Sequence, residues 1–125
     1  MRAVALALLL AATLAATATA RPGKRLAHYC STSGDLCYGV RKSSGAFLFD
    51  IDTFARYFAR YRLCLRPPGR AATCKTFAIH RRGRIFGSTI RFASAFKSSG
   101  PGRYRVEWKL GGRRLGPALS FRLRR

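Results

Sequence analysis

Apolar and polar residues alternate in short stretches along most of this chain, and turn-forming residues separate the stretches. In 59–66, 103–110 and 118–124, apolar side chains occupy every second position and mostly basic ones the positions between. A period of two is typical of a β-strand with one face against a core and the other in water. The pattern predicts an all-β, two-sheet fold of about seven strands, at 36–42, 46–51, 59–66, 73–80, 85–93, 103–110 and 118–124.

The segment Pro67-Pro68-Gly69 interrupts the alternation and predicts the turn of a hairpin. If the hairpin is centred on its glycine, Cys64 lies opposite Cys74 and Tyr61 lies opposite Phe77. Directly opposite residues have Cβ atoms about 4.5–5.5 Å apart, so this register would permit a disulfide on the outer face of the hairpin.

Two further turns are expected, at Arg81-Arg82-Gly83 and at Gly111-Gly112. The conformation of 53–59 stays open. Its aromatic residues suit one or two turns of helix, but they also suit a strand.

The first twenty residues, Met1 to Ala20, contain one early charge, Arg2, followed by a run of small and aliphatic residues that ends on Ala18-Thr19-Ala20. This is typical of a cleaved secretory signal peptide, and the run is too weakly apolar for a membrane anchor. We therefore expect a mature chain without a transmembrane span, secreted to the cell envelope or the extracellular space. It would consist of a loose basic arm at 21–27 and one domain at 28–125.

Export implies an oxidising compartment, so the four cysteines are expected to form disulfides. Four cysteines permit three pairings. The pairs Cys30–Cys37 and Cys64–Cys74 are favoured, because each brackets turn-forming residues. A metal site is the alternative, but neither pair has C-x₂-C spacing and neither histidine stands at a usual ligand interval. No metal and no cofactor are expected.

The end of the chain carries a resemblance to a known fold. Residues 101–108, the short glycine turn that follows, and then 115–117 and 121–123 are similar to the closing hairpin of bacterial immunoglobulin-like domains. Gly102-x-Tyr104 resembles the tyrosine corner of that fold. The resemblance implies an immunoglobulin-like antiparallel β-sandwich. The chain after residue 20 also resembles small secreted actinobacterial proteins of unassigned function.

The same ending is similar to periplasmic copper-binding domains of the CopC type, which share the strand Tyr104-x-Val106-x-Trp108. In that family a histidine at the mature N-terminus and an Asp-Gly-His turn hold copper. Here Arg21 and Gly111-Gly112-Arg113 stand at those places, so the resemblance brings no copper site with it.

Composition limits the chemistry further. The 125 residues include 25 Lys and Arg, 4 Asp and Glu and 2 His, which gives a net charge of +21. So few acids and histidines exclude most acid/base enzymes. His28 and His80 are expected on the surface, where neighbouring arginines would disfavour an imidazolium ion. No catalytic residue and no small-molecule substrate are inferred, and a small secreted enzyme is the least favoured reading.

The four acids have simpler expected roles than catalysis. Asp50 and Asp52 share one strand face and are expected to be solvated or to pair with Arg56 or Arg60. Glu107 is expected to bridge neighbouring guanidinium groups.

The basic residues are the strongest functional signal. If strand 59–66 and the two closing strands share a sheet, their outward positions form a basic face that would attract an anionic envelope polymer, an anionic membrane surface or nucleic acid. A structural or protein-interaction module with a protein partner is the alternative. The residues predicted to bind a polyanion are Arg60, Arg62, Arg66, Arg103, Arg105, Lys109, Arg113, Arg114, Arg122 and Arg124.

Overall fold

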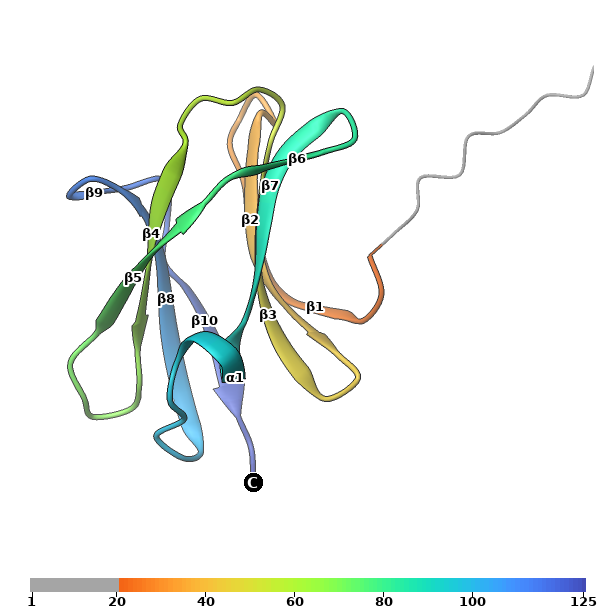
Figure 1. Ribbon diagram of the computed structural model, residues 1–125. Helices are drawn as coiled ribbons and strands as arrows, with labels where there is room; N and C mark the ends of the chain where they lie inside the picture. Colours follow the sequence, from red (N-terminus) through yellow and green to blue (C-terminus); the bar gives the residue numbers. More distant parts are fainter. Residues whose placement is uncertain (1–20) are drawn as a thin grey trace, which may run out of the picture.

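The computed structural model describes residues 21–125, so the predicted signal peptide lies outside the described residues. Two antiparallel sheets face each other (Figure 1). Sheet A has the order β1-β2-β3-β7-β6, formed by Lys24–Cys30, Leu36–Ser43, Ala46–Thr53, Ile85–Arg91 and His80–Arg82. Sheet B has the order β10-β8-β4-β5, formed by Leu119–Leu123, Gly102–Leu110, Arg60–Arg66 and Thr73–Ala78. The short β9, Arg113–Arg114, pairs with β8. The prediction of an all-β, two-sheet fold is confirmed.

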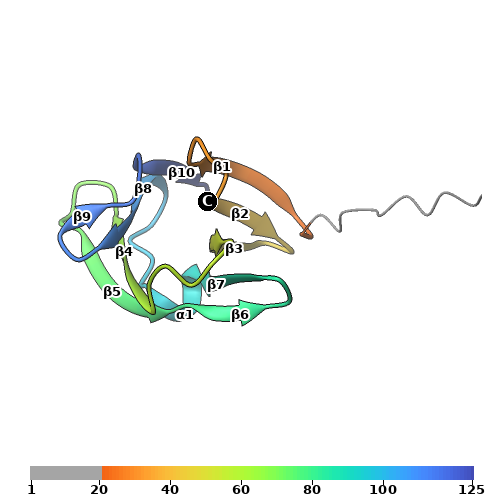
Figure 2. The same cartoon turned by 90° about the horizontal axis from the view of Figure 1, so that it is seen from above.

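One chain segment passes directly from sheet B to sheet A (Figure 2). A single strand was expected at 73–80, but it divides at Ile79, which is buried and donates its backbone N–H to Ala59 at 2.9 Å. The chain after Ile79 pairs with β7 instead. Arg81 and Arg82 therefore belong to β6, and the turn consists of Gly83, which adopts a φ of +61°, and Arg84.

An aromatic core joins the two sheets. Trp108 of β8 stacks on Tyr38 of β2 with ring centroids 4.4 Å apart, and Tyr104 stacks on Phe121 at 5.3 Å. All four side chains are buried, and they come from the inward positions of their strands. Burial of each large side chain contributes about 1.5–3 kcal/mol, so this layer supplies much of the stability that holds the sheets together.

Near the start of β8, the hydroxyl of Tyr104 forms hydrogen bonds to the preceding loop. The Tyr104 hydroxyl donates to the carbonyl of Gly100 at 2.6 Å and accepts from the backbone N–H of Ser99 at 3.0 Å. These bonds hold the 98–101 loop against the end of the core.

Two local expectations are corrected. The strand predicted for 85–93 ends at Arg91, because the chain turns into the single-turn helix α1, Phe92–Ala95, which buries Phe92 against the core. Of residues 53–59, whose conformation the sequence left open between helix and strand, Thr53 ends β3 and 54–59 form neither.

The N-terminal arm predicted for 21–27 is also corrected. β1 already begins at Lys24 and pairs with β2 from its first residue, Lys24 opposite Lys42. The other edge of β1 lies beside β10 of sheet B (Figure 2). The folded region therefore starts before residue 28, since the backbone of this segment is held by a neighbouring strand.

The expected hairpin register and disulfides are present. Cys64 pairs with Cys74 across β4 and β5, and Tyr61 pairs with Phe77. The structure contains both favoured disulfides, Cys30–Cys37 and Cys64–Cys74. Bonds of this kind fit an oxidising environment.

Candidate functional site

The outer face of sheet B carries the central part of the predicted basic surface. In β8, Tyr104, Val106 and Trp108 point into the core, so the residues between them point outward. β4 and β10 alternate in the same way. We call this surface the basic face; its members are Arg60, Arg62, Arg66, Arg103, Arg105, Lys109 and Arg122. Of the other residues predicted to bind a polyanion, Arg113 and Arg114 lie in β9 beside it, and Arg124 follows β10.

Strand register places basic residues directly opposite one another on this face. Arg66 of β4 is opposite Arg105 of β8, and Arg103 of β8 is opposite Arg122 of β10. Like charges in such positions destabilise a sheet. An anion bound between them would reduce this repulsion.

Glu107 is the one acidic residue that the described strands place on the basic face. It contacts both neighbours along its strand, Arg105 and Lys109, each at 3.5 Å. Glu107 therefore bridges two basic neighbours, but only one of them is a guanidinium group as the sequence predicted, and the other is the ammonium group of Lys109. Within residues 21–125, no acidic side chain pairs with the remaining arginines of the face.

At one end of the basic face the surface forms a shallow hollow of about 660 Å³. Its guanidinium groups come from three separate segments, and its other walls are mainly proline and small residues. No acidic residue lines it. The four arginines around this hollow, which we call the arginine hollow, are Arg66, Arg103, Arg105 and Arg114.

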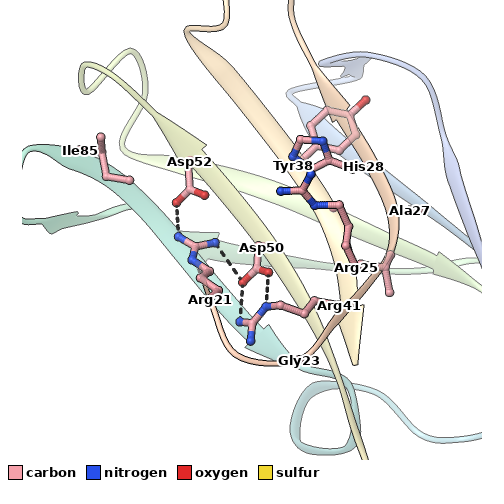
Figure 3. Close-up of a pocket in the computed structure, with 12 residues that line it drawn as sticks. Arg21, Gly23, Arg25, Ala27, His28, Tyr38, Arg41, Asp50, Asp52 and Ile85 are labelled. Atoms are coloured by element: carbon pink, nitrogen blue, oxygen red, sulfur yellow. Dashed lines mark hydrogen bonds and ion pairs between the residues drawn. The ribbon is translucent and has the colours of Figure 1, made fainter. Parts of the chain in front are cut away.

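A second hollow, of about 490 Å³, lies on the outer face of sheet A, on the opposite side of the sandwich (Figure 3). Its floor includes Gly39, where an added Cβ would come within 2.7 Å of the carbonyl of Ala27. Asp50 and Asp52 of β3 point into it, together with His28 of β1. The sequence analysis did not predict this hollow.

Two arginines that line this hollow pair with the aspartates (Figure 3). Arg41 donates to both carboxylate oxygens of Asp50, at 2.9 and 3.2 Å. Arg21 reaches Asp52 at 2.6 Å and Asp50 at 3.3 Å. The partners expected from the sequence, Arg56 and Arg60, are wrong. They lie beyond the end of β3, whereas Arg41 comes from the neighbouring strand and Arg21 precedes β1.

Asp50 has more hydrogen-bond and ion-pair partners than any other acidic residue of the described chain. Burial alone would raise its pKa, but hydrogen bonds from Arg41 and Thr89 and the charge of Arg21 outweigh burial and lower the pKa. The Thr89 hydroxyl donates to the carboxylate at 2.7 Å. Asp50 is therefore an anchor for the N-terminal segment, because Arg41 also donates to the carbonyl of Pro22 at 2.7 Å.

The histidines occupy different settings. His80 is exposed on β6 beside Arg81. His28 is also exposed, but its ring lies beside Cys30. The Sγ of Cys30 is 3.8 Å from Nε2 and 4.0 Å from Nδ1 of the ring. Burial and the charge of Arg25 lower the pKa of His28. Sequence spacing alone did not predict this neighbour, although His28-x-Cys30 on one strand places both side chains on the same face.

Comparison of the chain with protein-family models, with curated proteins and with solved structures found no match. Among the described residues, no helix is long and apolar enough to cross a membrane. The chemistry of the surface therefore carries the functional argument.

Proposed function

We propose that this chain is a secreted, non-catalytic binding module that engages an anionic polymer of the cell envelope, or another polyanion, through the basic face. The observation that carries the proposal is the arginine hollow, where four guanidinium groups surround a concave surface without an acidic residue. Guanidinium groups bind phosphate, sulfate and carboxylate oxygens in a bidentate manner, which suits repeated anionic groups along a polymer.

The proposed architecture is immunoglobulin-like. Two sheets with the orders β2-β3-β7-β6 and β10-β8-β4-β5 would correspond to the two sheets of that fold, with β1 as an additional edge strand. The hydrogen bond from Tyr104 to Gly100 supports this assignment, because a tyrosine at this strand start bonds back to the preceding loop in the tyrosine corner.

The decisive experiment separates the arginine hollow from the total charge of the chain. Binding of the purified protein to an anionic envelope polymer, to duplex DNA and to anionic vesicles is measured across a salt series. The variant Arg103→Glu/Arg105→Glu changes the hollow. The control Arg81→Glu/Arg84→Glu changes the net charge equally, but on the β6–β7 hairpin.

At ~150 mM salt, where the Debye length is about 8 Å, we expect wild type to retain a preference for one of the three ligands. The hollow variant should bind that ligand at least about tenfold more weakly, and the control should remain within about threefold of wild type. Equal losses in the two variants, or binding to every polyanion that disappears at this salt concentration, would contradict the proposal. A protein-interaction module, with affinity that depends weakly on salt, would then be the better reading.

A further inference from the structure

The two disulfides of this protein lie in different surroundings. Cys64–Cys74 connects β4 to β5 within sheet B, where Cys64 is only 4% exposed and Cys74 is half-buried. Cys30–Cys37 closes the β1–β2 hairpin at the end of sheet A, where Cys30 is exposed and Cys37 is half-buried. An external thiol can therefore approach the second bond more easily than the first.

An imidazole stands beside the accessible disulfide. His28 and Cys30 are two residues apart on β1, so their side chains share the outer face, and Cys37 lies directly opposite Cys30. A ring nitrogen of His28 and the Sγ atoms of Cys30 and Cys37 all lie within 4.8 Å of one another. Two sulfurs and one imidazole nitrogen are the donor set of many sites for Zn²⁺ and Cu⁺.

The charges around this disulfide are mixed: the carboxylates of Asp35 and Asp52 lie there together with the guanidinium group of Arg25. A hollow of about 370 Å³ next to the disulfide is lined by His28, both cysteines, Asp35 and Asp52, and also by Arg25, whose charge opposes a bound cation. Two of the four acidic residues of the chain therefore lie at this one place. Asp52, on the neighbouring strand β3, lies directly opposite Cys37.

We propose that Cys30–Cys37 is a reversible disulfide, and that after its reduction the two cysteines and His28 bind one thiophilic d¹⁰ cation, Zn²⁺ or Cu⁺. The reductant is a dithiol: it transfers two electrons and two protons to the disulfide and becomes a cyclic disulfide itself. The cation then displaces the two thiol protons and is held by two thiolates and one ring nitrogen. For Zn²⁺, a water molecule completes the tetrahedral site.

The site lies on the sheet opposite the basic face, so this proposal does not depend on polyanion binding. It also revises the sequence-based expectation that no histidine stands at a ligand position. His28 stands two residues before Cys30 on β1, which is not a usual ligand interval, but strand geometry places both side chains on one face.

The first stage of the test measures which disulfide reacts. The folded protein is titrated with dithiothreitol, free thiols are alkylated, and the labelled cysteines are identified by mass spectrometry. We expect Cys30 and Cys37 to become labelled at a dithiol concentration about tenfold or more below that needed for Cys64 and Cys74. Labelling of all four together, or of Cys64 and Cys74 first, would overturn the proposal.

The second stage measures binding by the selectively reduced protein. It is titrated with Co²⁺ as a spectroscopic probe for Zn²⁺, and with Cu⁺ in competition with a chromogenic chelator. We expect one equivalent to bind, with a thiolate-to-cobalt charge-transfer band in the Co²⁺ titration, and no binding by the oxidised protein. The two arms show which of the two cations the site prefers.

The matched variants are His28→Gln and His80→Gln, which remove the same group from the same face of sheet A. Both retain the disulfides, and unchanged fluorescence of Trp108 in the oxidised state will verify that they fold. We expect His28→Gln to weaken binding by about tenfold or more and His80→Gln to leave it unchanged. Absence of a charge-transfer band in wild type, or equal affinity of the two variants, would overturn the proposed ligand set.

Discussion

The ion pair between Asp50 and Arg41 gives the most sharply defined prediction. Replacing Asp50 with asparagine removes a carboxylate that accepts from Arg41 at 2.9 and 3.2 Å and from Thr89 at 2.7 Å. The side chains of Asp50 and Arg41 are only 11% and 12% exposed. Solvent therefore cannot replace the lost partner, and the guanidinium group would remain nearly buried without a counter-charge.

The expected loss follows from these contacts. A hydrogen bond to a charged group contributes about 1.5–3 kcal/mol, and breaking a buried ion pair by removing one partner costs about 3–5 kcal/mol. The asparagine oxygen can still accept one bond, which places Asp50→Asn near the lower end, at about 3 kcal/mol of unfolding free energy. Asp52→Asn is the matched control on the same strand face. Asp52 contacts Arg21 alone, with side chains 27% and 33% exposed, so its loss should cost no more than about 0.5 kcal/mol.

The assay is equilibrium unfolding in denaturant, followed by the fluorescence of the single tryptophan, Trp108, which is buried against Tyr38. The dependence of unfolding free energy on denaturant should be the same in all variants, so that shifts in the midpoint report stability. A double-mutant cycle with Arg41→Gln should give a coupling energy of about 2 kcal/mol. The reasoning would be refuted by a loss below about 1 kcal/mol in Asp50→Asn, or by an equal loss in Asp52→Asn.

Three further outcomes are expected in the same assay. Because the folded-state pKa of Asp50 is lowered, its stabilising contribution is present above the unfolded-state pKa of about 3.9 and is lost as pH falls through the folded-state value. The stability difference between wild type and Asp50→Asn should therefore narrow in strong acid, and a constant difference would contradict this. Tyr104→Phe removes the bonds to the 98–101 loop and should cost about 1–2 kcal/mol, whereas Tyr57→Phe, at an exposed site, should cost almost nothing. Gly39→Ala places a methyl group 2.7 Å from a backbone carbonyl and should cost more than about 1 kcal/mol, while Gly112→Ala meets no atom within 4 Å and should be neutral.

Predictions based on neighbouring residues agreed with the structure where a single turn connects the two strands. The register of the β4–β5 hairpin, with Cys64 opposite Cys74, required only the position of the Pro-Pro-Gly turn and the alternation on each side. The strand at 73–80 was predicted less accurately, because the alternation continues through Ile79 while the strand changes sheets there. A pattern of period two reports which face is buried, but not which sheet provides the partner.

In both hollows, alternation predicted which side chains point outward, but only the strand order brings the lining residues together. The outward positions of the basic face followed from alternation, yet the arginine hollow needs Arg114 of β9 next to Arg66 of β4 and Arg103 of β8, which the strand order brings together. On sheet A, Asp50 was expected to pair with Arg56 or Arg60, which follow it in the sequence. It pairs instead with Arg41, since antiparallel pairing of β2 and β3 places residue 41 close to residue 50 on the same face.

Local patterns in the sequence predicted the all-β class, the inward and outward faces of most strands and the strongly basic surface, and they favoured one of three disulfide pairings, because these features depend on periodicity, turn residues and composition. The tertiary structure decided which charges became partners, which arginines surround a common hollow, and which disulfide has an imidazole and two carboxylates beside it. These features depend on the order in which separate strands pair. That order is set by how the apolar faces of all the strands bury one another together, and no local segment contains this information.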